Sequence, residues 1–490
     1  MATVGTDPGT PRPTSSASDE RANGHSAPSN GNGNGSGNGH RPGQLNHHAA
    51  TNGSSPNGHL RAPGGGRHHG GDLRYAHIVG WGKEIPATII TNTDLEAVVE
   101  TSDEWIRSRT GIQARRFATD RETVTSMGLE AARRALDRAE MLPSELDLII
   151  VATSTPENFY PSTGSQIQNL LGASRAGAFD LGAACSGFVY ALNMAAQSIR
   201  SGSINNALVV GSEVNSRILD WSDRATCVLF GDGAGAVVLR GSDEPGGILA
   251  CVLGSDGSGA ELLGNPTVGS AVLAEGHKLH KLHMDGREVF RFGTHIIGDS
   301  IREVLTKADL TLADLSLIVP HQANQRILAA AARSMNIPES MFYSNVHKYG
   351  NTSAASIPIA LCEAEEDGRI KPNDRLILTG FGGGLSWATM VVQWENVQVR
   401  ATPALSNQLL RGRRQAEYAL AFWRDRIMRV YRRMETWLGG SPIQAANVRR
   451  KRNAERKNIT RVATTKSASR PSSKAKEPVA VVSKDKTGVE

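Results

Sequence analysis

Short runs of valine, isoleucine and leucine alternate with amphipathic stretches through the middle of the chain. Such runs predict strands, and the stretches between them predict helices. Within each run the apolar residues are nearly continuous, which is typical of strands that are covered on both faces. The alternation therefore predicts an α/β core over residues 74–396. The clearest predicted strands are residues 146–152, 206–210, 234–239, 315–319 and 376–378.

A loose repeat divides this core into two halves. In each half one predicted strand leads into a polar loop and another ends in a glycine turn, although spacing alone leaves chance similarity open. The connector-like segment SDEPGG (242–247) lies between them, so we predict halves at residues 74–245 and 246–396. The paired segments are LDLIIVATSTPE (146–157) with LSLIVPHQANQ (315–325), and NALVVGSEV (206–214) with RLILTGFGGG (375–384).

The net charge of +6 is distributed unevenly along the 490 residues. Residues 74–396 carry 27 basic and 37 acidic side chains, a net charge of −10. Residues 397–490 carry 22 basic and seven acidic side chains, a net charge of +15. An acidic core argues against a nucleic-acid partner. The basic charge belongs to a C-terminal extension, which needs its own explanation.

Residues 1–73 form a low-complexity segment rich in glycine, asparagine and serine. Almost no large apolar side chains are present to offset the entropy of ordering, so we expect a disordered tail. Seven of the 14 histidines lie here. A solvated linker explains them more simply than weak metal binding does.

Three further observations bear on the compartment. The N-terminus has no apolar signal sequence, and no apolar run reaches the roughly 18 residues that a transmembrane helix needs. The four cysteines form neither a disulfide framework nor a zinc motif. We therefore expect a cytoplasmic protein without a metal. The cysteines are Cys185, Cys227, Cys251 and Cys362.

Cys185 differs from the other cysteines because small residues surround it, in FDLGAACSGFVY (179–190). The apolar periodicity from Phe188 to Ile199 predicts a helix that begins just after it. A helix N-terminus lowers the pKa of a thiol, which would make Cys185 a nucleophile. A buried structural role is the alternative.

His321 and Asn351 lie on loops after predicted strands, where α/β proteins place functional groups. Their neutral N–H donors could stabilise negative charge that develops on a carbonyl oxygen. Taken singly, His321 could be a helix cap and Asn351 a turn residue. The glycine loop GFGGG (380–384) would let backbone N–H groups approach a ligand, as in an oxyanion hole. It lacks the spacing of a dinucleotide site.

The order Cys185, His321, Asn351 also fits a thiol protease. The sequence around the cysteine, AACSGF, differs from the CGSCW type of that class, and a duplicated α/β core is the wrong scaffold.

Residues 74 to about 396 resemble β-ketoacyl-acyl-carrier-protein synthase III, a family of condensing enzymes with the thiolase fold. The resemblance implies two duplicated α/β halves in a layered α-β-α-β-α core. It rests on six blocks in the family's order. They are TSDEWIRSRTGI (101–112), GAACSGFVYAL (182–192), LFGDGAGAVVL (229–239), PHQANQRI (320–327), HKYGNTSAASIPIAL (347–361) and GFGGGLSW (380–387).

The resemblance implies a reaction in two stages. Cys185 would take an acyl group from acyl-CoA while the N–H groups of Cys185 and Gly383 hold the oxyanion. His321 and Asn351 would then stabilise the enolate that malonyl-acyl carrier protein forms when it loses carbon dioxide. An asparagine as third residue resembles the initiating, decarboxylating members. The resemblance also implies an acyl carrier protein partner, a homodimer and no cofactor.

Further residues match the family's CoA-binding positions. Trp105 and Arg109 would stack on and pair with the nucleotide end, and Arg224 and Arg326 match basic positions at the channel mouth. Ala225 departs from the glycine that often follows the arginine. Tyr160 corresponds to a residue that reaches from the partner subunit toward the acyl pocket and would favour short primers.

The resemblance ends near residue 396, and the extension over 397–490 follows. Apolar residues at spacings of three and four predict a basic amphipathic helix over residues 404–438, with Arg413 interrupting one position. Such a helix suits an anionic membrane surface, self-association or packing on the core, or recruitment of acyl carrier protein. The Lys-, Ser- and Ala-rich composition of the end of the chain predicts a solvated, disordered segment. The apolar positions are Leu409, Ala416, Leu420, Trp423, Ile427, Val430, Met434 and Trp437.

We therefore predict a homodimeric condensing enzyme that starts fatty acid synthesis from acyl-CoA and malonyl-acyl carrier protein. It would lie in the cytoplasm, with a peripheral position at the membrane as an option. One alternative is a related acyl-condensing or acyl-transfer enzyme of specialised metabolism. The other is a membrane- or partner-binding scaffold whose thiolase-fold body is inactive.

Overall fold

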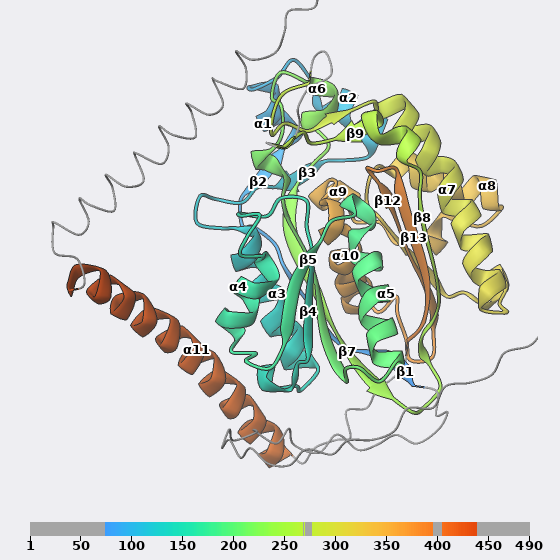
Figure 1. Ribbon diagram of the computed structural model, residues 1–490. Coiled ribbons are helices and arrows are strands. Elements are labelled where there is room, and N and C mark those ends of the chain that lie inside the picture. Colours follow the sequence, from blue (N-terminus) through green and yellow to red (C-terminus); the bar gives the residue numbers. More distant parts are fainter. Residues whose placement is uncertain (1–73, 268, 270–276, 395–403, 439–490) are drawn as a thin grey trace, which may run out of the picture. The chain divides into compact units, whose positions relative to one another are not determined.

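The computed structural model describes residues 74–267, 269, 277–394 and 404–438 (Figure 1). The predicted disorder of residues 1–73 and of the end of the chain lies outside these residues. Within them, the predicted alternation of strands and helices forms two sheets with helices between and outside them. The two halves, with their boundary at residue 245, stay a prediction.

The first sheet has five strands in the order β1-β7-β6-β4-β5. β4 is parallel to both neighbours, whereas β7 is antiparallel to β1 and to β6. β5 was not predicted, because it lies at an open edge and its sequence GAFDL has few apolar residues. The strands are β1 (Tyr75–Glu84), β4 (Leu148–Ala152), β5 (Gly177–Leu181), β6 (Asn206–Val214) and β7 (Asp232–Ser242).

The second sheet has four strands in the order β11-β12-β13-β8. β11 and β12 are parallel, and the other two pairs are antiparallel. All five predicted strands are thus present, three in the first sheet and two here, with longer bounds for β6, β7 and β12 than the sequence indicated. The strands are β8 (Gly247–Ser255), β11 (Leu317–Pro320), β12 (Arg375–Gly382) and β13 (Ser386–Gln393).

Two helices lie between the sheets, α5 (Gly187–Arg200) and α10 (Ser356–Glu366). α5 contacts β4 and β6 on one side and β12 and β13 on the other, and α10 contacts β7 and β11. Every residue of α10 from Ser356 to Ala364 is buried, which fits a sequence that is apolar nearly all round the helix. The shared core that results includes Phe188, Leu239, Leu361 and Leu378.

Outer helices cover the remaining faces of both sheets. α3 and α4 pack on the first sheet, and α7 and α8 belong to the core on the outer side of the second. The order of layers is therefore α-β-α-β-α (Figure 1). These helices are α3 (Val124–Arg138), α4 (Thr163–Leu171), α7 (Gly286–Lys307) and α8 (Gln325–Met335).

The short elements form the region around the functional cavity. Two antiparallel ribbons, β2 with β3 and β9 with β10, are found here. The elements are β2 (Ile89–Thr91), β3 (Ala114–Arg116), β9 (Leu263–Gly264), β10 (His283–Met284), α1 (Asn92–Glu96), α2 (Asp103–Thr110), α6 (Arg224–Cys227) and α9 (Val346–Tyr349), with short 3-10 turns between many of them.

The extension forms one long helix, α11 (Ala404–Leu438), at the predicted position. It contacts α4, and Tyr418 joins the core formed by α3, α4 and the first sheet. Among the described residues, no helix combines the length and the apolar character that a membrane span requires.

Candidate active site

Cys185 lies in a tight turn between β5 and α5. Ala184 has a positive φ of 44°, and the 3-10 turn Ala184–Ser186 leads directly into the helix. The second sheet approaches this turn through glycine: a Cβ atom at Gly382 would lie 3.0 Å from the Cβ and 3.2 Å from the Sγ of Cys185. The close approach of β12 to this turn therefore helps to bury the thiol, which is 6% exposed.

The pKa of this thiol differs from the prediction. Burial raises the pKa of Cys185 to about 12, although the hydrogen bond with Ser353 lowers it. The sequence-based expectation of a lowered pKa is wrong, because desolvation of the thiolate outweighs the influence of the α5 N-terminus. The thiol therefore keeps its proton at neutral pH and must lose it during the reaction.

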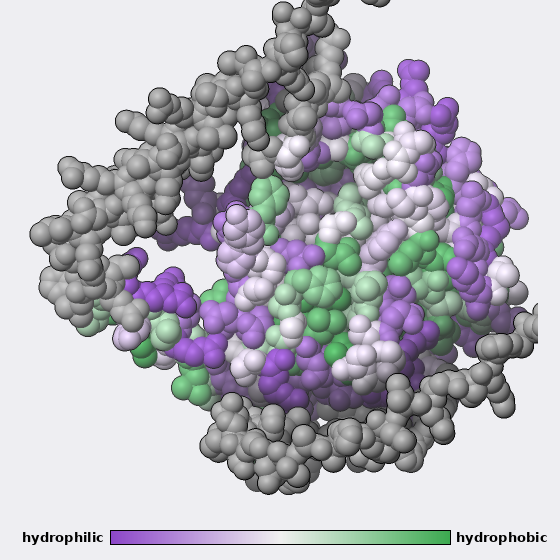
Figure 2. Space-filling view, viewed as in Figure 1, coloured by the Kyte–Doolittle hydropathy of each residue, from purple (hydrophilic) through white to green (hydrophobic). Residues whose placement is uncertain are grey.

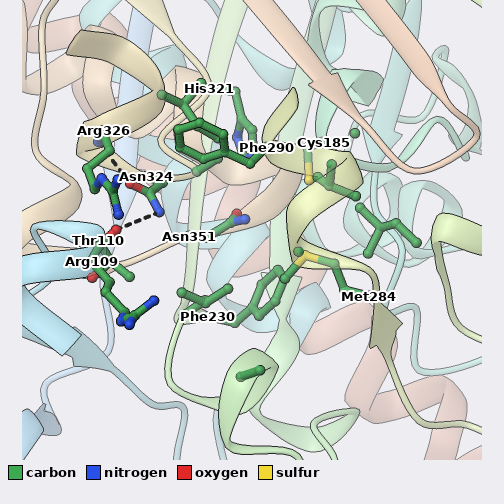
Figure 3. Close-up of a pocket in the computed structure, with 18 of the residues that line it drawn as sticks. Arg109, Thr110, Cys185, Phe230, Met284, Phe290, His321, Asn324, Arg326 and Asn351 are labelled. Atoms are coloured by element: carbon green, nitrogen blue, oxygen red, sulfur yellow. Dashed lines mark hydrogen bonds between the residues drawn. The ribbon is translucent and has the colours of Figure 1, made fainter. Parts of the chain in front are cut away.

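His321 follows β11 and is 1% exposed. Its backbone N–H donates to the carbonyl of Thr379 over 2.7 Å, and its ring meets Phe381 edge-on with centroids 5.4 Å apart. Burial lowers the pKa of His321 to about 3, so the imidazole is neutral. Nδ1 is buried and has no hydrogen-bond partner among the described residues. Figure 3 shows the ring on the wall of the cavity.

Asn351 is held by its backbone on both sides. Its N–H donates to the carbonyl of Leu229 over 2.8 Å, and its carbonyl accepts from Gly231 over 3.0 Å. The side-chain Oδ1 accepts a hydrogen bond from the Ser353 N–H over 2.8 Å. This contact uses the amide oxygen, so the NH2 group is the part of the side chain that is left to bind a ligand in the cavity.

These three side chains line one cavity of about 550 Å³ (Figure 3). They come from the ends of β5 and β11 and from the turn after α9, which are distant in the sequence. Most of the remaining wall is apolar. Further lining residues include Thr110, Leu229, Phe230, Leu263, Met284, Phe290, Ala323 and Phe381.

The predicted CoA contacts gather at this cavity. Trp105, Arg109 and Arg326 line it. The guanidinium of Arg109 lies 5.2 Å from the centroid of the Trp105 ring, and that of Arg224 lies 5.8 Å from the same ring. Arg224 is not on the cavity wall, and it donates to the carbonyl of Glu100 over 2.8 Å. An indole flanked by two cations suits a nucleotide with its phosphates.

Besides Arg224, two further predicted residues lie outside the cavity wall. Gly383 follows β12 beside Ala184, so its backbone is next to the turn of Cys185. Tyr160 is 88% exposed and does not line the cavity of its own chain. Its reach from a partner subunit stays a prediction.

Sequence reasoning missed a polar network behind the nucleophile. Cys185 Sγ donates to Ser353 Oγ over 3.5 Å, and Ser353 donates to Glu213 over 3.0 Å. Glu213 is fully buried, and it accepts further hydrogen bonds from Thr153, Thr155 and the Ser154 N–H. Burial raises its pKa to about 6. A glutamate within the apolar strand β6 was the available signal.

Comparisons with known proteins agree with this geometry. Two models of the 3-oxoacyl-[acyl-carrier-protein] synthase III family match, one over residues 179–257 and its C-terminal counterpart over 305–394. The chain is 47% identical over 324 residues to the β-ketoacyl-[acyl-carrier-protein] synthase III of Roseiflexus sp. (strain RS-1), covering 65% of this chain and 98% of the relative. The enzyme of Clostridium acetobutylicum is also 47% identical, and the match covers 66% of this chain and 99% of that enzyme.

Solved structures give the same result. The 3-oxoacyl-[acyl-carrier-protein] synthase III of Aquifex aeolicus is 46% identical with a TM-score of 0.62, covering 65% of this chain and all of that one. A priming β-ketosynthase from the R1128 polyketide pathway is 36% identical with a TM-score of 0.63, and the match covers 69% of this chain and 99% of that one. The fold is thus the predicted thiolase-like α/β fold, and residues at both termini have no counterpart. The chain belongs to the β-ketoacyl-[acyl-carrier-protein] synthase III family and is an acyltransferase of the condensing type.

Proposed function

We propose that the protein condenses a short acyl-CoA with malonyl-acyl carrier protein and so starts fatty acid synthesis. The observation that carries the proposal is the convergence of Cys185, His321 and Asn351 in one cavity that Trp105 and Arg109 border. Acyl carrier protein is the carrier in the names of the relatives.

In the first stage the Cys185 sulfur attacks the thioester carbon of acyl-CoA. The carbonyl oxygen becomes an oxyanion, which the N–H groups of Cys185 and Gly383 would stabilise. The C–S bond to CoA then breaks. The thiol proton ends on the sulfur of CoA, which leaves as a free thiol, and the acyl group remains on Cys185.

In the second stage malonyl-acyl carrier protein loses carbon dioxide. The electrons of the broken C–C bond form an enolate, whose oxygen would accept hydrogen bonds from His321 and Asn351. A neutral imidazole suits this role because it donates an N–H without needing a positive charge, in agreement with its lowered pKa. The enolate carbon attacks the acyl group, and Cys185 leaves as a thiolate that takes a proton from solvent.

Acylation tests this proposal directly. Intact-protein mass spectrometry after incubation with acyl-CoAs of different length should show one added acyl group and reveal the preferred primer. Cys185→Ala should abolish both the adduct and product formation, whereas Cys251→Ala, a half-buried cysteine outside the cavity, should keep both. Product formation by Cys185→Ala would refute the assignment. Failure of the wild type to acylate with any acyl-CoA would instead favour an inactive scaffold.

We also propose a homodimer formed at the β5 edge. β5 is an edge strand, and an unpaired edge offers backbone groups to a second copy. Figure 2 shows an apolar area on this side of the molecule. Exposed apolar side chains of β5, α5 and the edge strand β8 support it: Phe179 is 41%, Met194 46% and Leu253 40% exposed. Patches of this kind mark interfaces.

The proposed location is a membrane surface, to which α11 would bind. One face of α11 packs on the body: Arg414 is buried, with its Nε 3.0 Å from Asp137, and Tyr418 and Ala421 are buried beside it. Glu417 accepts a hydrogen bond from Ser144 over 3.1 Å. Packing on the core, one of the expected alternatives, therefore describes this face of the helix.

The opposite face of α11 is exposed and apolar. Trp423 lies nine residues after Arg414, about two and a half turns, and so points away from the body. A row of apolar side chains on this face is half exposed or more. Leu420 is 69%, Trp423 58%, Ile427 62%, Val430 53% and Met434 52% exposed.

Arginines lie on both sides of this row, among them Arg424 and Arg426. Two acidic residues of the helix already pair with arginines of the same helix, Glu417 with Arg413 and Asp425 with Arg429. Two such helices would repel each other, whereas anionic lipid headgroups would attract the arginines and accept the apolar row. These features support an anionic membrane over self-association.

A further inference from the structure

Glu261, His277 and His283 form a cluster beside the cavity that the reaction does not use. One ligand atom from each lies within 4.8 Å of the others. The two imidazole rings stack with their centroids 3.5 Å apart and their planes 20° apart. Two imidazoles and one carboxylate are a donor set that Zn²⁺ prefers.

The two ring nitrogens of His283 lack hydrogen-bond partners among the described residues, and both are buried. A neutral imidazole is the form that binds metals. A buried polar nitrogen without a partner is costly, and a metal ion bound to one of the two ring nitrogens would satisfy that nitrogen.

The backbone around the cluster is held in place. His283 pairs with Gly264 across the β9–β10 ribbon, and a Cβ at position 264 would lie 2.8 Å from the imidazole. The N–H of Leu282 donates to the carbonyl of Ile218 over 2.9 Å, and that of Asp285 to Leu262 over 2.7 Å. The ligands therefore need side-chain movement, not refolding, to close on an ion.

The nearby lysines bind other groups and form no ion pair with the Glu261 carboxylate. Lys278 lies 2.6 Å from Asp220, and Lys281 donates to the carbonyl of Leu219 over 2.8 Å. Glu261 has no ion pair within the described ranges. A divalent cation would thus meet one uncompensated negative charge and two neutral donors.

We propose that Glu261, His277 and His283 bind a divalent transition-metal ion, best matched by Zn²⁺, with water in the fourth position. Leu263 and Met284 lie in the same ribbon and line the cavity. The ion would therefore link the ribbon to the turn that carries Glu261 and fix this part of the cavity wall. The ligands lie 16 and six residues apart, so no zinc motif marks them, and the expectation of no metal would be wrong.

Zn²⁺ binding to the full chain tests the site. Equilibrium dialysis should show one fewer bound Zn²⁺ for His277→Ala and for His283→Ala than for the wild type, and a loss of at least tenfold in affinity for Glu261→Gln. His295→Ala, which removes an exposed histidine of α7, is the matched control and should bind like the wild type. Circular dichroism would confirm that each variant is folded.

Hydrogen exchange locates the ion, because dialysis alone does not distinguish this cluster from other histidines and cysteines of the full chain, such as the seven histidines of residues 1–73 and the pair Cys185 and His321. Zn²⁺ should slow exchange of residues 277–285 in the wild type and in Cys185→Ser, but not in His283→Ala. Unchanged stoichiometry in both histidine variants, or no protection of this segment in the wild type, would overturn the proposal. Acylation of Cys185 in chelator-treated protein is independent of these outcomes, so the proposed reaction is tested separately.

Discussion

Cys185 Sγ and Ser353 Oγ lie 3.5 Å apart, and the same serine donates a hydrogen bond to the buried carboxylate of Glu213. The serine thus links the nucleophile to an acid that never reaches the cavity wall. The two partners act on the thiol in opposite directions: the Ser353 hydrogen bond lowers its pKa, and the charge of Glu213 raises it. Variants at Ser353 and at Glu213 should therefore shift the pKa of the Cys185 thiol in opposite directions.

Ser353→Ala should raise the pKa of the Cys185 thiol further. The variant loses the Ser353 hydroxyl, whose hydrogen bond lowers the thiol pKa, a change of about 1 kcal/mol, or roughly fivefold in thiolate population. The rate of iodoacetamide alkylation as a function of pH measures this pKa. Ser334→Ala, on the outer helix α8, serves as the control. An unchanged alkylation profile for Ser353→Ala would show that the serine does not act on the thiol.

Glu213→Gln should lower the pKa of the same thiol, because it removes a nearby negative charge but keeps an acceptor for Ser353. Alkylation at a fixed pH below the thiol pKa should become faster than in the wild type. A decrease in rate, with the variant still folded, would contradict the proposed electrostatic role.

Glu213 should also make stability depend on pH. Its pKa is raised from 4.5 to about 6 by burial, so its ionisation opposes folding. The wild type should lose about 2 kcal/mol of unfolding free energy relative to Glu213→Gln as the pH rises from about 3.5 to about 7, with little change above that. Urea unfolding at several pH values measures the difference. Parallel curves for the two proteins would show that Glu213 has an ordinary pKa.

His321→Ala and Asn351→Ala should affect the second stage more than the first. Loss of one donor to the enolate should slow decarboxylation about 10²–10³-fold. Acylation of Cys185 should continue, because the oxyanion donors of that stage are backbone N–H groups. Release of labelled carbon dioxide and intact mass report the two stages separately. Equal losses in both would place these residues in acylation as well.

Gly382→Ala should disrupt the nucleophile turn, since the new methyl group would lie 3.0 Å from the Cβ of Cys185. A forced contact of this kind typically costs 1–3 kcal/mol, so about that much unfolding free energy and most acylation should be lost. Gly412→Ala is the control, because its Cβ would point into open space on a helix. That variant should be neutral or up to about 1 kcal/mol more stable.

Membrane binding through α11 should depend on lipid charge and on the exposed apolar row. Flotation with phosphatidylglycerol vesicles should carry the wild type upward, and phosphatidylcholine vesicles should carry much less. Trp423→Ser combined with Ile427→Ser should reduce flotation at least fivefold, whereas Phe422→Ser, on another face, should change it little. Unchanged flotation of the double variant would contradict membrane binding through the apolar row. Formation of higher oligomers through α11 in the absence of vesicles would favour self-association.

Sequence reasoning found several strands whose apolar residues are continuous, such as β4 and β6. It missed β1, β8 and β13, and it missed β5, whose pairing depends on a neighbour rather than on its own composition. It placed Cys185, His321 and Asn351 at loop positions, which the structure brings together. The thiol pKa could not be foreseen, because it is decided by burial, to which the close approach of the second sheet at Gly382 contributes. Likewise periodicity located α11 but could not show that Arg414 would be buried against Asp137.

A dimer built on the β5 edge would hold two copies of α11 on one rigid particle, since each helix packs on its own body through Tyr418 and Arg414. Once one helix meets a lipid surface, the second is confined near it at a high effective concentration. Even if one α11 helix binds lipid weakly, the dimer with two helices would then bind the surface tightly and reversibly. Dilution of the subunits would release the enzyme from the surface, so the level of expression itself would set the fraction that is bound.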